Sequence, residues 1–223
     1  AQPHAIAWDP VSAAKGEFKH FMQKEIFEQA RSITDTIRGR IDFEKGEVIL
    51  PDLHLTPEKA KSLKRIVTVA CGTSFYSGLV GKFFIEQIAR ISVEVDYGSE
   101  YRYRDPILDE DTAVLAITQS GETVDTLAAM EEARNKKALL WSIVNAVGSQ
   151  AMRESNGYIT MNAGPEIGVA STKAFTSSIV DQFLLALYLG QLRGTVNKEQ
   201  MQAYIQDLAR LPDIIGRTLE QDG

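Results

Sequence analysis

The segment AVLAITQSGETVDT, residues 113–126, has the residue types and spacing of an anion-binding turn. Its first five residues form an uninterrupted apolar run, which is typical of a strand buried on both faces of a parallel sheet. Apolar residues recur at helical spacing from Val124 onward. The first N–H groups of a helix have no partner within the helix, and the helix dipole favours an anion there.

The turn between this strand and this helix is rich in neutral hydrogen-bond donors. Gly121 lets the backbone approach a ligand closely, and the polar side chains are those of Thr118, Gln119, Ser120 and Thr123. Neutral donors without Lys or Arg suit a phosphate monoester that must be bound and then released. The simpler alternative is an N-cap by Ser120, but a cap needs one hydroxyl group rather than three and an amide. We therefore predict a phosphate site.

Two further loops carry similar chemistry. The sequence CGTS at residues 71–74 also follows an apolar run and opens a helix. Alone it is best explained as a helix cap, but together with the first turn it adds Thr73 and Ser74 as the second wall of a phosphate cup. The third loop, residues 162–172, contains small residues that allow backbone groups to line a pocket, and Ser171 is available to cap a helix or to bond a substrate hydroxyl.

Lys173 directly follows the third loop, in the first turn of a predicted helix. The helix dipole disfavours a cation there, so we expect a carboxylate, Glu122 or Glu166, to offset its charge. The alternative is a lysine whose ammonium group reaches solvent.

Strands that alternate with helices must position these loops. Strands are predicted at residues 66–70, 91–97, 113–117, 138–144 and 158–161, and helices after residue 73, after residue 123, and at 147–155, 171–193 and 198–218. This order indicates an α/β fold, a three-layer αβα sandwich around a mainly parallel sheet of about five strands. Ligands of such sheets bind beyond the carboxyl ends of the strands. Because each of the three loops follows a predicted strand, we expect all three to lie at this edge of the sheet.

The ends of the chain have a different character. Residues 18–38 predict one amphipathic helix, and residues 41–57 are interpreted as a linker. Pro212 should kink or break the last helix. We therefore divide the chain into an N-terminal arm, helix and linker at 1–57, a ligand-binding subdomain at 58–194 and a C-terminal helical segment at 195–223.

Composition narrows the class of protein. The chain has 223 residues, 44% of them hydrophobic, and its net charge of −6 argues against a nucleic-acid partner. One cysteine and no visible signal peptide lead us to expect a reducing, cytoplasmic location. The longest apolar run, 183–189, is too short to span a membrane. Three scattered histidines predict no metal site, and neither G-x-G-x-x-G nor G-x-x-x-x-G-K-[ST] occurs, so we expect no cofactor.

Three motifs together resemble the sugar isomerase (SIS) family. They are CGTSFYSG from residue 71, TQSGETVDTL from residue 118 and NAGPEIGVASTKAFT from residue 162. The segment FKHFMQKEIFEQ, from residue 18, resembles the part that precedes the first SIS subdomain in one enzyme of the family. One short motif would be weak, but three long motifs in this order are specific.

The resemblance implies a ligand and a set of site residues. The implied ligand is fructose 6-phosphate, and the implied product is glucosamine 6-phosphate. The implied parent enzyme, of which this chain would be a part, is an aminotransferase and isomerase that takes ammonia from glutamine. The residues that match the family's phosphate-binding positions are Thr73, Ser74, Gln119, Ser120 and Thr123, and Thr118 stands where the family commonly has Ser. Those that match its sugar-binding positions are Val169, through its backbone, and Ser171.

The resemblance also implies a homodimer and parts that have no counterpart here. The glutaminase domain and a second SIS subdomain, which would follow the C-terminal helical segment, are absent from the chain, as are the family's catalytic Glu, His and Lys. We therefore expect no catalytic residue in this chain and no activity of the chain alone.

Two alternatives stay open. A sugar-phosphate-sensing regulatory module would carry the same domain behind a DNA-binding helix-turn-helix, which the acidic charge disfavours. A related sugar-phosphate isomerase or deglycase would need its own acid/base residue near the site, and the absence of histidine after His54 weakens that reading.

Overall fold

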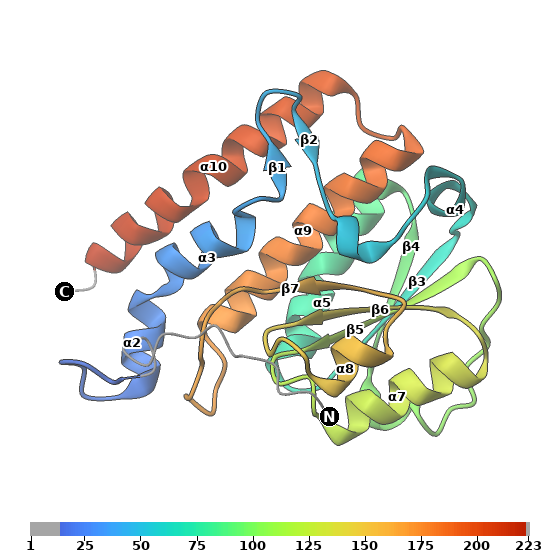
Figure 1. Ribbon diagram of the computed structural model, residues 1–223, viewed down its shortest axis with the longest axis horizontal. Coiled ribbons are helices and arrows are strands. Elements are labelled where there is room, and N and C mark those ends of the chain that lie inside the picture. The colour runs from blue at the N-terminus through green and yellow to red at the C-terminus, as the bar shows by residue number, and fades with distance from the viewer. Residues whose placement is uncertain (1–13, 222–223) are drawn as a thin grey trace.

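The computed structural model describes residues 14–221, and its centre is a five-stranded parallel sheet (Figure 1). The strands are β3 (Arg65–Ala70), β4 (Ser92–Tyr97), β5 (Thr112–Thr118), β6 (Leu139–Val144) and β7 (Gly157–Thr160), in spatial order β4-β3-β5-β6-β7. Every residue of β5 is buried, as expected for a central strand covered on both faces. The predicted α/β class and parallel sheet are confirmed.

Helices cover both faces of the sheet. On one face lie α9 (Lys173–Arg193) and α5 (Thr73–Phe84), the latter extended by the π-helical turn η2 (Ile85–Ala89). On the other lie α7 (Val124–Asn135) and α8 (Gln150–Glu154) (Figure 1), together with the short helix α6 (Gly98–Tyr101), which contacts α7. Side chains of β5 alternate between two cores: Leu115 joins the larger cluster with α9, and its neighbour Val114 joins the cluster with α7. The period of two in a strand makes this division.

The single helix predicted over residues 18–38 is wrong, because the structure has two helices there. These are α2 (Phe21–Phe27) and α3 (Gln29–Ile37), joined at Glu28. The two helices have different partners: α3 packs on α9 and α10, whereas the buried Glu25 of α2 bonds the loop before α9. The break at Glu28 allows each helix to follow its own partner.

Residues 41–57, interpreted as a linker, are part of the packed structure. They form the hairpin of β1 (Ile41–Asp42) and β2 (Glu47–Val48) and the 3-10 turn η1 (Pro51–Leu53), before α4 (Pro57–Ser62). Apolar residues spaced along the segment, among them Val48 and Leu53, are buried in the larger core. A Cβ atom on Gly157 would lie 2.5 Å from the carbonyl oxygen of Leu53, so η1 lies directly against β7. The boundaries at residues 57 and 194 stay a prediction.

The last helix, α10 (Lys198–Glu220), runs through Pro212, so the predicted break is wrong, and the alternative of a kink stays a prediction. The helix begins with a capping box between Asn197 and Gln200 and buries Met201, Ile205 and Leu208, and it packs along α3. This packing outweighs the one backbone hydrogen bond that proline removes. None of the helices between residues 14 and 221 combines the length and apolar character that a bilayer crossing requires.

A buried ion pair connects the N-terminal segment to α9. Arg40 donates to the carboxylate of Asp181 and to the carbonyl oxygen of Thr160, at the end of β7. Asp181 is fully buried, and its second oxygen has no hydrogen-bond partner among the described residues. Burial raises the pKa of Asp181 from its ordinary 3.8 to about 7, although Arg40 beside it lowers it.

We predict that Asp181 makes the stability of the protein depend on pH. Between pH 3.8 and about 7 the folded chain keeps a proton that the unfolded chain releases. The free energy of unfolding should therefore fall as pH rises through this window, by up to about 1.4 kcal/mol per pH unit, and should level off above it. Asp181→Asn removes this contribution. Urea unfolding of both proteins across the window measures the difference.

The exposed Asp213 serves as the control for this experiment. Its hydrogen bond from Arg217 lowers its pKa from the ordinary 3.8, so Asp213 stabilises the fold above this pH and the contribution is lost as pH falls below it. Asp213→Asn should therefore remove a pH dependence of the opposite sign, confined to acidic pH. If the stability difference between the wild type and Asp181→Asn stays flat or grows from pH 4 to pH 7, the raised pKa is wrong.

Candidate sugar-phosphate cleft

A cleft forms where the chain leaves β3 and β5 in opposite directions. Ala70 and Ile117 are register partners near the carboxyl ends of these neighbouring parallel strands. The chain then enters α5 on one face of the sheet and α7 on the other. Such a switch point opens a crevice beyond the strand ends. In this structure the crevice is a cleft of about 390 Å³.

The residues predicted for the phosphate and the sugar all line this one cleft. They are Thr73, Ser74, Thr118, Gln119, Ser120, Thr123, Val169 and Ser171. The structure therefore brings the three predicted loops together, and it separates none of these residues from the others. Their role in binding stays a prediction.

The structure adds lining residues that the sequence analysis did not assign to the site. Thr126 lies one helical turn after Thr123 on α7, so helical periodicity could have found it. Glu166 and Gly168 also line the cleft; Glu166 was considered only as a partner for Lys173. Cys71 lies half-buried at the start of the loop between β3 and α5, where its Sγ is 3.7 Å from the hydroxyl of Thr126.

In the turn from β5 to α7, backbone N–H groups donate hydrogen bonds to two of the hydroxyl groups and so orient them. The Thr118 Oγ1 accepts from the Gly121 N–H at 3.2 Å, and the Ser120 Oγ accepts from the Glu122 N–H at 3.2 Å. The proton of Ser120 Oγ is therefore free to point to a ligand. Thr123, not Ser120, is the N-cap of α7, and its side chain makes no capping bond. The simple capping role considered for Ser120 is wrong.

Gly121 is needed in this turn for two reasons. Its φ of +68° lies in the left-handed region, which residues with a Cβ rarely adopt. A Cβ atom at this position would also lie 2.0 Å from the Oγ of Ser149, at the start of α8. The turn is thus packed tightly against the next helix, which fixes the donors beside it.

Helix dipoles and hydroxyl groups, rather than a cationic side chain, would favour an anion in this cleft. Among the described residues that line it, none is Lys or Arg and one, Glu166, is a carboxylate. The positive field comes instead from the N-termini of α5 and α7, which both begin at its walls. Hydroxyl donors at two helix N-termini are chemistry suited to a phosphate group.

The carboxylate of Glu166 caps the N-terminus of α9. Its carboxylate accepts from the Ser171 Oγ at 2.8 Å, the Thr172 N–H at 2.9 Å and the Ala174 N–H at 3.1 Å. A carboxylate is favourable at the positive end of the helix dipole. Both of its oxygens are occupied by these bonds, so Glu166 shapes the loop before α9.

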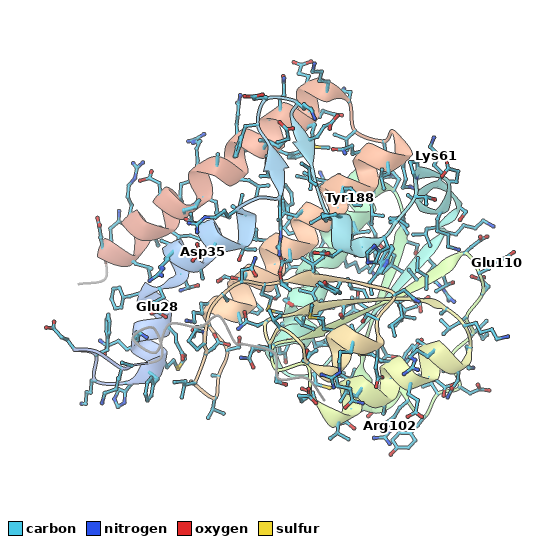
Figure 2. All side chains as sticks on the ribbon, viewed as in Figure 1. Glu28, Asp35, Lys61, Arg102, Glu110 and Tyr188 are labelled. Carbon is cyan, nitrogen blue, oxygen red and sulfur yellow. The ribbon has the colours of Figure 1, made fainter. Side chains whose placement is uncertain are left out.

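Lys173 pairs with Glu28, not with Glu122 or Glu166, so the predicted partners are wrong. Its Nζ lies 2.7 Å from Glu28 Oε2, and its side chain is only 2% exposed, which also excludes the solvent-facing alternative. Figure 2 shows Glu28 at the corner between α2 and α3, beside the loop that leads into α9. The partners are 145 residues apart, and no local pattern signals such a contact.

The architecture and this cleft define an α/β domain with a polar cleft at a switch point between its parallel strands, which is where domains of this class bind ligands. The model of the SIS domain family matches residues 61–187. The chain belongs to the SIS domain family, which confirms the resemblance drawn from its motifs.

Two bacterial enzymes are similar in sequence to this chain over nearly its whole length. A glutamine–fructose-6-phosphate aminotransferase (isomerizing) of Symbiobacterium thermophilum is 45% identical over 96% of this chain and 35% of its own length. The enzyme of that name from Chlorobaculum tepidum is 48% identical over 93% of the chain and 34% of its own length. The chain therefore spans about a third of these relatives.

One solved structure is similar in both fold and sequence. It is the C-terminal domain of glucosamine-fructose-6-phosphate aminotransferase from Francisella tularensis. It superposes with a TM-score of 0.84 and 35% sequence identity, over 90% of this chain and 56% of that chain.

We predict that the two partners of the Lys173 ion pair differ in what their removal does to stability. Glu28→Gln leaves a buried ammonium group without its counter-charge, and should lower the free energy of unfolding by about 3 kcal/mol. Lys173→Met should destabilise less, because the remaining carboxylate is 24% exposed and lies 3.2 Å from Lys24. Urea unfolding at pH 7 measures both.

The surface pair of Arg31 and Asp35, in the same N-terminal segment, provides the control. Arg31→Ala should change stability by less than about 0.5 kcal/mol, since exposed pairs contribute little. Equal or reversed effects of Glu28→Gln and Lys173→Met would contradict the proposed asymmetry.

Proposed function

We propose that this chain is the fructose 6-phosphate-binding subdomain of a glutamine–fructose-6-phosphate aminotransferase. In the parent reaction, fructose 6-phosphate and glutamine become glucosamine 6-phosphate and glutamate. The observation that carries the proposal is the convergence of hydroxyl side chains from two helix N-termini on one cleft, whose lining within residues 14–221 contains no Lys or Arg. The names of the similar enzymes support the choice of ligand.

Each part of the cleft has a role in this proposal. Ser74, Ser120 and Thr123 donate to the phosphate, together with Thr73, Thr118 and Gln119. The third loop holds the sugar through the backbone of Val169 and the hydroxyl of Ser171. The proposal also includes what such a parent requires: a glutaminase domain, a second SIS subdomain, a homodimer and a cytoplasmic location. The enzymes among the relatives do not favour the regulatory module.

The phosphate cup can be tested by calorimetric titration of the chain with fructose 6-phosphate. Each hydrogen bond to a charged group contributes about 1.5–3 kcal/mol, or roughly 10- to 100-fold in Kd. We expect Ser120→Ala and Thr123→Val each to weaken binding by such a factor, and fructose without its phosphate to give no measurable binding.

Matched substitutions outside the cleft serve as controls. Ser62 and Thr218 are exposed on α4 and α10, so Ser62→Ala and Thr218→Val should bind as the wild type does. Unchanged affinity in both cleft variants would rule out this site assignment.

We further predict that the chain alone binds without catalysing isomerisation. Moving the proton between C1 and C2 of the sugar needs a general base. Within the described lining, Glu166 is the one carboxylate, and its oxygens already accept hydrogen bonds from Ser171, Thr172 and Ala174. A coupled assay for glucose 6-phosphate, with fructose 6-phosphate as substrate, should show no turnover above the buffer. Sustained turnover that co-purifies with the chain would contradict this part of the proposal.

A further inference from the structure

Glu25, on α2, is a buried carboxylate directed at the loop that leads into α9. It is only 2% exposed. Its Oε1 accepts from the Ile167 N–H at 2.5 Å and the Gly168 N–H at 3.0 Å, and its Oε2 lies 3.2 Å from the same Gly168 nitrogen. A buried carboxylate is costly unless it is hydrogen-bonded, and here two consecutive backbone amides supply charge-assisted bonds.

The packing at Gly168 leaves no space between this loop and α2. A Cβ atom on Gly168 would lie 2.5 Å from Glu25 Oε2 and 3.4 Å from the Cβ of Met22. Gly168 is not among the described glycines with positive φ, so its backbone does not require a glycine. The close approach of the carboxylate to the backbone requires it.

Side chains, rather than backbone bonds, hold this loop. Among the described residues, the part of the loop between Gly164 and Thr172 makes no backbone–backbone hydrogen bond. Glu25 accepts from the N–H groups of Ile167 and Gly168 in the middle of the loop, and Glu166 accepts from that of Thr172 at its end. The Val169 side chain, next to Gly168, is fully exposed, so its own packing does not fix its backbone. The position of Val169 therefore depends on Glu25.

We infer that Glu25 is a positioning residue for the sugar end of the cleft. It does not line the cleft but fixes the backbone of Ile167 and Gly168, and through them that of Val169. The inference rests on the proposed function, in which Val169 contacts the sugar and the two other loops hold the phosphate. It assigns part of the sugar affinity to α2, which lies outside residues 61–187 matched by the family model.

The test compares two ligands that need different parts of the cleft. Dissociation constants for fructose 6-phosphate and for inorganic phosphate are measured from the amide NMR shifts of the cleft residues, which report millimolar binding. We expect Glu25→Ala to weaken fructose 6-phosphate roughly tenfold, the equivalent of one lost hydrogen bond, and to change the phosphate constant by less than about twofold. Gly168→Ala should reproduce this split, because its Cβ displaces the same carboxylate.

Two further variants separate positioning from general destabilisation. Glu25→Gln keeps one acceptor oxygen, so it should recover most of the affinity for fructose 6-phosphate and also supplies a folded protein should Glu25→Ala not fold. Gln23→Ala, on the exposed side of α2, should leave both constants unchanged. Adding Gly168→Ala to Glu25→Ala should cost little more than either alone, since both remove the same contact.

The outcomes distinguish this inference from the proposed function. Equal weakening of both ligands by Glu25→Ala and Gly168→Ala would mean a structural role only and would overturn the inference. Unchanged affinity for fructose 6-phosphate in both would overturn it as well, while leaving the proposed function intact. A wild-type chain that binds inorganic phosphate but binds fructose 6-phosphate no more tightly would overturn the proposed function instead.

Discussion

The alignment of β3 with β5 is the constraint on which the cleft depends. Ala70, the last residue of β3, is the register partner of Ile117, the last but one residue of β5. The two following helices leave on opposite faces of the sheet. The hydroxyls of both loops therefore meet above one point. A register slip of two residues would displace one wall by about 7 Å and separate the donors. The complete burial of β5 on both faces holds the register, because the side chains of a buried strand specify its pairing strongly.

The charged side chains Lys173 and Glu166 are paired within the structure, which leaves helix dipoles and hydroxyl groups to face the cleft. The ammonium of Lys173 is bound to Glu28 and buried, and the carboxylate of Glu166 is bound at the start of α9. Both charges are held in the structure by partners other than a ligand. What faces the cleft are the N-termini of α5 and α7 with their neutral donors. Neutral donors bind a phosphate without the long-lived pairing that a desolvated lysine or arginine would give.

The segment before the first strand of the sheet is packed against the elements that form the cleft. Three carboxylate contacts connect it to α9 or to the loop before it: Glu25 with Gly168, Glu28 with Lys173, and Asp181 with Arg40. All three join residues more than 140 positions apart in the chain. A site on three loops thus acquires a fourth support, from a helix that precedes the domain the family model covers.

Local patterns determined the elements and the two walls of the cup. The apolar run at 113–117 followed at once by hydroxyl residues predicted a buried strand and an anion-binding turn, since burial and helix N-terminal chemistry are both encoded within a few residues. The CGTS motif did the same for the second wall, and topology rules placed both at one sheet edge. Thr73, Ser74, Ser120 and Thr123 accordingly lie together.

The tertiary structure alone decided which residues pair with the buried charges. It also decided that α10 is continuous and that the N-terminal helix is divided into α2 and α3. Lys173 selects Glu28 over Glu122 and Glu166 because folding brings α2 to the start of α9, an approach that sequence spacing does not report. Pro212 predicted a break by its local cost, yet packing on α3 keeps α10 continuous. Conversely, α2 and α3 separate at Glu28 although their periodicity is continuous. Local propensities are worth up to about 1 kcal/mol for most residues and about 3 kcal/mol for a proline inside a helix, and contacts between distant elements override them here.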